Sequence, residues 1–560
     1  MERIWLKSYD PKTPHCAQYP QTCIPQVLEK NARDFPDNPA VEFFGARLAY
    51  RQLFDHVLRL ANGLKGIGVE VGAKVAIMLP NTPQCVIAYY AALWLGATVV
   101  MTNPLYVERE LLHQWTDSEA EFLFTLDHLY PKVQTVLPKT AIRSTIVTSI
   151  KDYLPFPLRY LYPVKARFQK LFQSVPYDGI RLLSFRKMIA DNRPEPVACG
   201  ARPDGLALLQ YTGGTTGTPK GAMLTHKNLV ANVVQLVSWF PDMALGKERV
   251  LAVLPFFHVL GMTVALNFSL YTASAVIVVP RFDPDELIKT IKKKRPTLFP
   301  GVPAIYIAIM AHPKVDSFDL TSIRFCVTGA SAMPVDILRR FEQKTGSTII
   351  EGYGLSEASP VTHVNPIEGT RKPGSIGLAL PDTDCRIVDP QSGSLDVAPG
   401  EVGELIVSGP QVMAGYWKRE RETSEALREG WLYTGDLATM DSEGYVFIVD
   451  RKKDMVISSG YNVYPREIEE VLYEHPKVVD VAAIGVPHPK RGEVLKVFVV
   501  VKPGAHLTSE EILAWCKERL APYKVPKEIE FSESLPKTNV GKVLRRELRS
   551  KTGGEPKARQ

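Results

Sequence analysis

Most of this chain alternates between two patterns, short apolar runs and longer stretches whose apolar residues have helical spacing. Residues 74–79, 145–148 and 250–254 are apolar runs of the kind found in buried strands. The stretches between such runs repeat apolar residues three and four positions apart, as one face of a helix does. Strands that alternate with helices predict an α/β fold in which helices cover parallel sheets.

Two longer apolar runs, at residues 85–102 and 259–280, approach the length of a membrane span. Gly96 and Ala97 divide the first run into a helical half and a β-branched half. The second run contains asparagine, serine and threonine and ends in a strand-like segment. Both runs therefore predict buried helix–strand pairs of a soluble protein.

The pattern changes after residue 386, where short strands with glycine-rich turns predict a more antiparallel, β-rich subdomain. A dense charge run from Asp450 to Asp454 follows, and we interpret it as a domain junction, although a solvated loop would look the same. The segments after it predict a small α+β unit. We therefore expect a large domain of helix-covered parallel sheets with a β-rich subdomain over residues 1–450, and a second domain over residues 451–560.

One segment, residues 153–185, is aromatic, basic and contains several prolines. It predicts an insertion that runs over the surface of the large domain. Two interpretations stay open, which are contact with lipid and a satellite apolar cluster under a loop.

Composition changes this picture little. Hydrophobic residues make up 45% and charged residues 23% of the 560 residues, as in globular proteins, and the length predicts two or more domains. The net charge of +7 is mild for this length. It slightly favours anionic ligands or an anionic membrane surface, and it does not point to nucleic acid.

The cysteines and the N-terminus bear on the compartment. Seven cysteines lie far apart, their number is odd, and no two have the spacing of a zinc site. This predicts free thiols in a reducing cytoplasm. The first residues contain no apolar stretch that resembles a signal peptide.

The most informative motif is the run YTGGTTGTPKG at residues 211–221. Glycines let the backbone approach a ligand closely, while threonine hydroxyls, backbone N–H groups and Lys220 suit phosphate oxygens. It is not a Walker A loop, because Gly221 and not a hydroxyl residue follows the lysine. A strand at 206–211 precedes it, and Thr225 is placed to cap a helix after it. We expect a strand, a glycine loop and a helix that together hold a triphosphate.

Four further motifs pair polar groups with tight turns, and each alone has an ordinary structural explanation. Their sequences are EGYGLSE at 351–357, YTGD at 433–436, LPFFH at 254–258 and PKTNVGK at 536–542. An aromatic ring can stack on a purine and a carboxylate can hold Mg²⁺. A carboxylate on a turn, such as Asp436, suits two ribose hydroxyls.

Together and in this order, these motifs resemble the adenylate-forming acyl-CoA synthetases, the superfamily that includes firefly luciferase and peptide-synthetase adenylation domains. The resemblance covers nearly the whole chain, from LPN at 79–81 to Lys542. It is greatest to the bacterial long-chain fatty-acid–CoA ligases. Three segments support this narrower match, namely QY at 210–211, EGYGLSEASP at 351–360 and GYNVYPRE at 460–467.

The resemblance implies a role for each matching residue. The phosphate-binding loop would comprise Thr212, Gly213, Gly214, Thr215, Thr216, Gly217, Thr218 and Lys220. Gly352 and Tyr353 would contact adenine, with Gly354 and Ser356 beside them, and Asp436 and Arg451 would bind the ribose hydroxyls. Glu357 and Thr212 would hold Mg²⁺, Ser459 and Gly460 would face the thioester tunnel, and Lys453 or Asp454 would be the hinge. The residues implied in catalysis are Lys542, Glu357, Thr212 and His258, of which His258 would also border the acyl pocket.

The resemblance also implies the reaction. A fatty-acid carboxylate attacks the α-phosphorus of ATP, pyrophosphate leaves, and coenzyme A then displaces AMP from the acyl-adenylate. Lys542 would serve only the first step, after which the small, mobile C-terminal domain would rotate. The apolar stretch after His258 would line the tunnel, with Met262 where some long-chain relatives have a gating tryptophan.

Several alternatives stay open at this stage. They are a ligase for a medium-chain or aryl acid, acyl transfer to a carrier protein, a luciferase-type oxygenase, and a non-catalytic acyl- or nucleotide-binding protein. We expect ATP, Mg²⁺ and coenzyme A as cofactors and co-substrates. The expected location is the cytoplasm, with peripheral contact at the inner membrane face and a homodimer as open possibilities.

Overall fold

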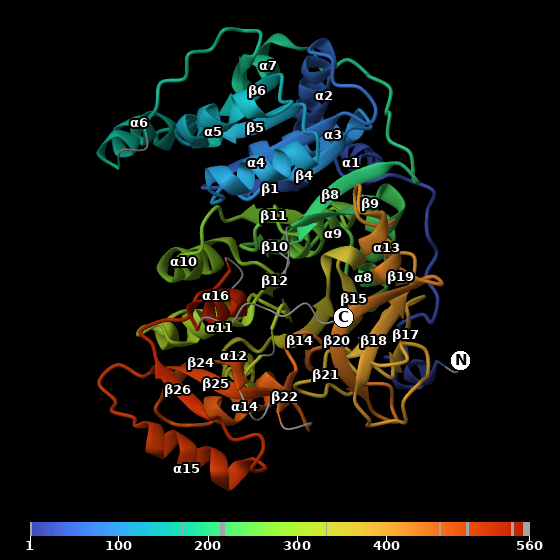
Figure 1. The fold of residues 1–560 in the computed structure, drawn as a ribbon. Coiled ribbons are helices and arrows are strands. Elements are labelled where there is room, and N and C mark those ends of the chain that lie inside the picture. Colours follow the sequence, from blue (N-terminus) through green and yellow to red (C-terminus); the bar gives the residue numbers. More distant parts are fainter. Residues whose placement is uncertain are drawn as a thin grey trace.

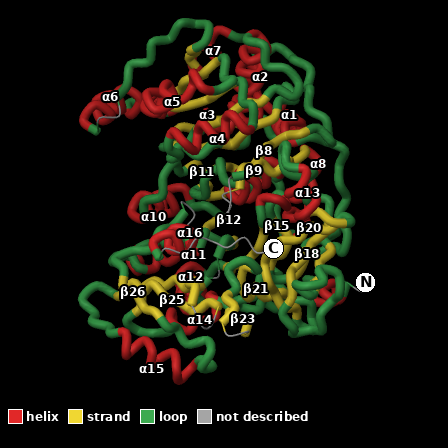
Figure 2. The backbone as a smooth tube through the Cα atoms, viewed as in Figure 1, coloured by secondary structure: helices red, strands yellow, loops and turns green. Residues whose placement is uncertain are grey.

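The computed structural model describes residues 3–169, 172–212, 219–331, 333–458, 461–488, 492–538 and 543–552. Strands within these ranges form four sheets, and helices alternate with them along the chain (Figures 1 and 2). Two large sheets and the helices around them build the upper and middle parts of Figure 1, and the C-terminal elements lie at its lower end. The predicted α/β class is confirmed.

The seven-stranded sheet has the order β7-β6-β5-β3-β4-β8-β9 and is parallel except for the β8–β9 pair. On its outer face, α4 and α5 bury Trp115 and Val133 against the strands. Its elements are β3 (Lys74–Met78), β4 (Thr98–Met101), α4 (Glu108–Asp117), β5 (Phe122–Leu126), α5 (Tyr130–Val136), β6 (Ser144–Thr148), α6 (Leu158–Phe168), β7 (Leu182–Ser184), α7 (Phe185–Asp191), β8 (Leu206–Thr212) and β9 (Lys220–Thr225).

The nine-stranded sheet has the order β16-β15-β14-β13-β12-β10-β11-β1-β2. It is parallel from β14 to β1 and antiparallel at both edges. Its strands are β1 (Pro39–Phe43), β2 (Ala46–Ala49), β10 (Arg249–Ala252), β11 (Ala275–Val278), β12 (Leu298–Gly301), β13 (Phe325–Thr328), β14 (Thr348–Gly354), β15 (Val361–Val364) and β16 (Leu378–Ala379). The helices α10 (Pro284–Lys294), α11 (Pro303–Met310) and α12 (Val335–Thr345) cover one face.

A helical layer separates the two large sheets. It contains α1 (Ile24–Asp34), α2 (Tyr50–Gly66), α3 (Pro83–Trp94), α8 (His226–Trp239), the π-helix η5 (Gly261–Asn267) and α9 (Phe268–Tyr271). Every residue of α3 is buried, because this helix contacts strands of both sheets. That position explains why α3 is apolar on all sides, as a membrane span would be. No described helix is both long and apolar enough to cross a bilayer.

The β-rich subdomain predicted after residue 386 forms an antiparallel sheet. Its buried residues, such as Leu405 and Leu432, belong to the same core as the two large sheets. Its elements are β17 (Asp384–Val388), β18 (Gly403–Ser408), α13 (Glu420–Ala426), β19 (Leu427–Arg428), β20 (Trp431–Met440) and β21 (Val446–Arg451).

The C-terminal elements form the fourth sheet and have a separate apolar core. The chain changes sheets between Arg451, which pairs with Asp436, and Val456, which begins β22. The elements are β22 (Val456–Ser458), β23 (Tyr461–Val463), α14 (Pro465–Tyr473), β24 (Val478–His488), β25 (Gly492–Val501), α15 (Ser509–Arg519), β26 (Glu528–Phe531) and α16 (Arg545–Lys551). The domain division at 450/451 stays a prediction.

One expectation for the glycine loop is wrong. The segment after it is not the helix but β9, which pairs antiparallel with β8 and brings Thr212 opposite Lys220. The predicted helix follows as α8, and Thr225 caps it by accepting a hydrogen bond from the Asn228 amide. Residues 213–218 therefore link two paired strands, and α8 begins only after β9.

Candidate functional site

The candidate site begins where β14 ends, at the junction between the nine-stranded sheet and the β-rich subdomain. The predicted residues Gly352, Tyr353 and Gly354 are the last residues of β14, and Ser356 and Glu357 begin the single 3₁₀ turn η7 (Ser356–Ala358). Polar groups after the carboxyl ends of parallel strands form sites in many α/β proteins.

Gly354 makes this turn possible. A Cβ atom here would lie 2.1 Å from the carbonyl oxygen of Pro360, so no other residue fits without moving the backbone. The Leu355 amide donates to the same carbonyl at 3.0 Å and closes the turn. The turn places Glu357 beside the edge of the β8–β9 hairpin.

Tyr416 connects Glu357 with Lys220. Its hydroxyl donates to Glu357 Oε1 at 2.7 Å, and Lys220 Nζ lies 5.3 Å from the centre of its ring. Lys220 Nζ also lies 3.8 Å from Glu422 on α13. Burial, followed by the Glu357 carboxylate, raises the pKa of Tyr416, so this hydroxyl stays a donor. A carboxylate on η7 and the ammonium group of a β9 residue thus both contact Tyr416 beside the β8–β9 hairpin.

Asp436 is the centre of a second group. Its carboxylate is 3% exposed and lies opposite Arg451 in the β20–β21 pair. Arg451 Nε lies 2.6 Å from Asp436 Oδ1, and the Tyr353 hydroxyl donates to Oδ2 at 2.5 Å. Each carboxylate oxygen keeps a further lone pair for an incoming hydroxyl. The structure thus brings together Tyr353, Asp436 and Arg451, three of the four residues expected at adenine and ribose.

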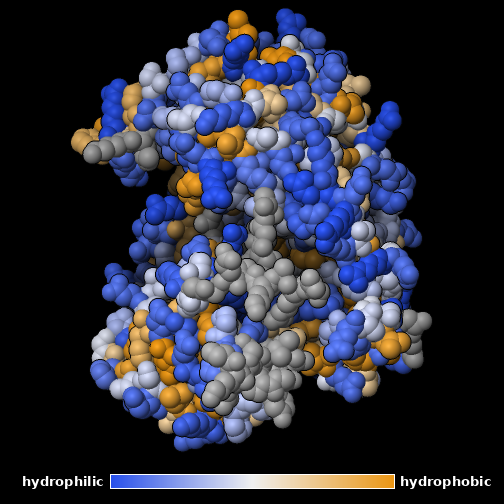
Figure 3. Space-filling model, viewed as in Figure 1, coloured by the Kyte–Doolittle hydropathy of each residue, from blue (hydrophilic) through white to orange (hydrophobic). Residues whose placement is uncertain are grey.

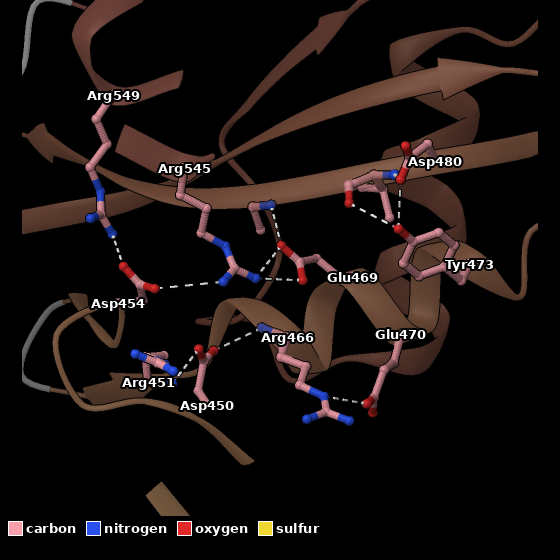
Figure 4. Close-up of polar contacts among 12 residues, drawn as sticks. Asp450, Arg451, Asp454, Arg466, Glu469, Glu470, Tyr473, Asp480, Arg545 and Arg549 are labelled. Atoms are coloured by element: carbon pink, nitrogen blue, oxygen red, sulfur yellow. Dashed lines mark hydrogen bonds and ion pairs between the residues drawn. The ribbon is translucent and has the colours of Figure 1, made fainter. Parts of the chain in front are cut away.

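The predicted hinge residues follow directly. Lys453 is half-buried, and burial together with the neighbouring Arg451 lowers its pKa. Asp454 is buried, and its carboxylate lies 2.8 Å from Arg549 Nη2 and 3.6 Å from Arg545 Nη1 (Figure 4). Both arginines lie on α16, four residues apart, so they share one face of that helix.

Arg545 also joins α16 to α14. Its Nη2 donates to both carboxylate oxygens of Glu469 at 2.7 Å, and Glu469 accepts the Ala483 amide at 2.8 Å (Figure 4). Burial raises the pKa of Glu469 and the Arg545 charge opposes this shift. Burial alone would lower the pKa of Arg545. The carboxylates of Glu469, Asp450 and Asp454 outweigh this effect and raise the pKa. We call Asp454, Glu469, Arg545 and Arg549 the α16 ion-pair network.

The residues expected at the acyl side lie after β10. His258 is half-buried, and its carbonyl accepts the Met262 amide at 2.9 Å as the chain enters η5. Met262 is fully buried in this π-helix. A π-helix widens the turn and is frequent at functional sites. No tunnel is assigned to these residues by the structure, so their role stays a prediction.

Several expected residues lie outside the described part of the chain. They are Gly213, Gly214, Thr215, Thr216, Gly217, Thr218, Ser459, Gly460 and Lys542. Thr212 and Lys220, at the two ends of the loop, are described.

Four residues of this region were not predicted from the sequence. Tyr416 was visible as part of an AGYW run at 414–417, which combines a glycine with two aromatic residues. The partners Glu422 and Glu469 carry no local signal, because only the fold brings them to Lys220 and Arg545. Arg545 follows Lys542 by three residues and resembles an ordinary surface charge in the sequence.

The Tyr416–Glu357 hydrogen bond gives a first prediction. We expect Tyr416→Phe to lower kcat/KM for ATP about tenfold, since a hydrogen bond to a charged group contributes about 1.5–3 kcal/mol. Tyr433→Phe is the matched control, because that hydroxyl donates to the Gly393 carbonyl in the β-rich subdomain. Acid-dependent exchange of labelled pyrophosphate into ATP measures both variants. Equal losses in the two would contradict a role for Tyr416 in positioning Glu357.

Comparisons with known proteins agree with this geometry. Residues 28–417 match the family described as AMP-binding enzyme, and residues 467–542 match the AMP-binding enzyme C-terminal domain. The chain is 46% identical to the long-chain-fatty-acid–CoA ligase of Bacillus subtilis (strain 168), with 98% of each chain covered. It is 39% identical to the enzyme of that name from Escherichia coli O157:H7, with 99% of each covered. Among solved structures, ATP-bound MatB from Rhodopseudomonas palustris superimposes with a TM-score of 0.83 at 30% identity, over 94% of this chain and 98% of MatB.

Proposed function

The chain belongs to the AMP-binding enzyme family, and on that premise we propose that it is an ATP-dependent ligase that joins a long-chain fatty acid to coenzyme A. The observation that carries this function is the full-length similarity to long-chain-fatty-acid–CoA ligases together with the convergence of Lys220, Glu357, Tyr353, Asp436 and Arg451. A non-catalytic binding protein would not require a carboxylate, Glu357, and a lysine, Lys220, that contact the same tyrosine.

The nucleotide-binding roles are part of the proposal. Asp436 accepts the ribose hydroxyls through its remaining lone pairs, while Arg451 and the Tyr353 hydroxyl hold its carboxylate in place. Lys220 and the loop that begins at Thr212 bind the β- and γ-phosphates. Lys220 lies opposite Thr212 in the β8–β9 pair, so it stands beside the point where the chain enters residues 213–218.

The oxygen atoms of Glu357 and Thr212 also fit a magnesium ion as ligands. Mg²⁺ is usually bound through one or two carboxylates plus substrate phosphates. Within the described residues Glu357 forms no ion pair, and one of its oxygens accepts only the Tyr416 hydroxyl, so acceptor sites remain. We propose that Glu357, with Thr212, holds Mg²⁺, which when bound neutralises phosphate charge during adenylation.

Two anions must react in the first step, and the chain supplies positive charge to counter their repulsion. The fatty-acid carboxylate oxygen bonds to the α-phosphorus of ATP, and the bond to the pyrophosphate oxygen breaks. Lys220 stabilises the leaving pyrophosphate, and Lys542 is proposed to bridge the carboxylate and the α-phosphate. The thiol of coenzyme A then attacks the acyl carbonyl, and AMP leaves with one oxygen of the original carboxylate.

A change of domain position between the two steps is also proposed. The hinge is placed at Lys453 or Asp454, where the chain leaves β21 for the fourth sheet. The α16 ion-pair network would move with the C-terminal domain and carry the segment that contains Lys542. A few residues between two elements suffice to absorb such a rotation. Ser459 and Gly460 are proposed to face coenzyme A, and His258 and Met262 the acyl chain.

The expected partners extend beyond the substrates. We propose peripheral contact with the inner face of the membrane, where long-chain acids dissolve. The homodimer stays a prediction.

A panel of carboxylates tests the substrate. We expect kcat/KM to rise from octanoate to palmitate, because each buried methylene contributes about 0.8 kcal/mol. AMP and pyrophosphate should form in equal amounts during steady-state turnover, which should need both the acid and coenzyme A. Aryl acids such as ferulate serve as the comparison. Faster turnover of an aryl acid than of palmitate would contradict the long-chain assignment.

A further inference from the structure

The helix α6 carries large apolar side chains on its solvent side, the reverse of an ordinary surface helix. Phe168 is 85% exposed and Leu161 57%, and Tyr160 and Val164 are also exposed. Phe156, just before the helix, is 84% exposed. Exposed apolar residues scattered singly are normal, but a contiguous group indicates an interaction site.

These residues form one stripe along the helix. Tyr160, Val164 and Phe168 are four positions apart on the helix, so they lie on the same face, and the ring of Phe156 contacts that of Tyr160 at 6.3 Å between centroids and extends the stripe. Ala166, the buried residue of α6, lies on the opposite side. Figure 1 shows α6 at the edge of the large domain, and Figure 3 shows orange atoms beside blue ones at that edge.

The segment that carries the stripe is strongly basic. Residues 151–187 contain eight lysines and arginines and two aspartates, a net charge of +6, whereas the whole chain has +7. Lys165 and Arg167 lie on either side of the stripe and are exposed. Nearly all the excess positive charge of the chain is therefore in the segment that includes α6.

The two aspartates of this segment have local structural roles. Asp178 accepts the amides of Ile180, Arg181 and Leu182 at 2.8–2.9 Å. Asp152 accepts the Thr148 hydroxyl and the Ser149 amide at 2.9 Å. Neither aspartate pairs with a described lysine or arginine, so the basic side chains are not neutralised by them.

The segment is anchored at both ends. The Tyr153 hydroxyl is 3.0 Å from His56 Nδ1, and the ring of Tyr153 meets that of buried Phe185 edge-on. The satellite-cluster interpretation of residues 153–185 thus holds for the ends of the segment. It does not account for α6, whose apolar stripe points into solvent.

We propose that α6 is a membrane-docking helix that lies in the plane of an anionic bilayer. The Phe156, Tyr160, Leu161, Val164 and Phe168 side chains enter the acyl boundary, and Lys165 and Arg167 meet lipid phosphates. A second copy of the chain is a poorer occupant, because two segments of net charge +6 would repel each other. Docking would give the enzyme access to acids dissolved in the bilayer, and this benefit rests on the proposed function. The docking itself does not rest on it.

Vesicle binding tests this assignment with the full-length chain. Co-sedimentation with phosphatidylglycerol vesicles should exceed that with phosphatidylcholine vesicles and should weaken with salt. The variant Leu161→Ser/Val164→Ser/Phe168→Ser should reduce binding at least tenfold. Its matched control is Val71→Ser/Leu245→Ser/Leu395→Ser, which removes three similarly exposed apolar side chains elsewhere and should stay within twofold.

A pair of charge-reversal variants tests the electrostatic component of membrane binding. It also provides an independent test in case the triple serine variant misfolds. Lys165→Glu/Arg167→Glu should lose the salt-dependent part of binding, whereas Lys292→Glu/Lys293→Glu on α10 should retain it. Turnover of soluble octanoate should be unchanged in all variants, which separates this inference from the proposed function. Unchanged vesicle binding in both α6 variants would overturn the proposal. A variant of α6 that changes only the oligomeric state in solution, and not vesicle binding, would also overturn it.

Discussion

Asp436→Asn is expected to lower kcat/KM for ATP about a hundredfold or more, mainly through a higher KM. Asp436 is the buried acceptor proposed for two ribose hydroxyls, and each hydrogen bond to a charged group contributes about 1.5–3 kcal/mol. The substitution keeps the shape but removes the charge that faces Arg451. Steady-state kinetics with ATP as the varied substrate measure the effect.

The control is Asp396→Asn in the same subdomain. Asp396 pairs with Arg386 at 2.7 Å but is largely exposed, so its loss should change kinetics less than threefold. An Asp436 variant with unchanged KM for ATP would contradict the ribose assignment. A lowered melting temperature without a kinetic change would give Asp436 a structural role alone.

Glu469→Gln is expected to destabilise the C-terminal elements by about 3 kcal/mol, because it removes the carboxylate that accepts two hydrogen bonds from Arg545 and leaves that buried charge with the more distant Asp454, at 3.6 Å. Since α16 follows Lys542 by three residues, adenylation should also slow, by about a hundredfold in kcat. The KM for ATP should stay within about threefold, because Asp436 and Tyr353 are untouched. Urea unfolding and pyrophosphate exchange measure the two effects.

The adjacent residue provides the control. Glu470 forms an exposed pair with Arg466 at 2.9 Å, so Glu470→Gln should change stability by less than about 0.5 kcal/mol. The double variant Glu469→Met/Arg545→Met should recover most of the lost stability, because a buried pair replaced by apolar residues is often neutral. If adenylation recovered with it, the network would act only through stability. Similar losses in Glu469→Gln and Glu470→Gln would contradict a specific role for the α16 ion-pair network.

The sequence predicted helices and strands correctly where the hydrophobic period of a segment and its length indicated the same type of element. The split of residues 85–102 at Gly96 corresponds to α3 and β4, and Thr225 caps α8 as expected. The strand β9 was missed, because KGAMLT, which ends in the capping residue Thr225, looks like the end of a loop. Its pairing with β8 is a tertiary contact, which local pattern does not encode.

The candidate site divides in the same way. Tyr353, Glu357, Asp436 and Arg451 lie in recognisable motifs, and the fold brings them together. Their partners come from distant segments. Tyr416 reaches Glu357 because residues 414–417 run beside β9, and Glu469 meets Arg545 because α14 and α16 pack on one sheet. Such pairs depend on strand register and on the packing of distant elements, so no local sequence motif predicts them.

The central claim is that this chain activates a fatty acid as an acyl-adenylate. Transfer of an oxygen isotope tests this claim most directly. Palmitate with both carboxylate oxygens replaced by ¹⁸O would be incubated with ATP, Mg²⁺, coenzyme A and the enzyme. The account predicts one ¹⁸O atom in each AMP, one in each palmitoyl thioester, and none in pyrophosphate. Formation of ADP in place of AMP, with ¹⁸O found in inorganic phosphate, would indicate an acyl-phosphate intermediate and would contradict the account.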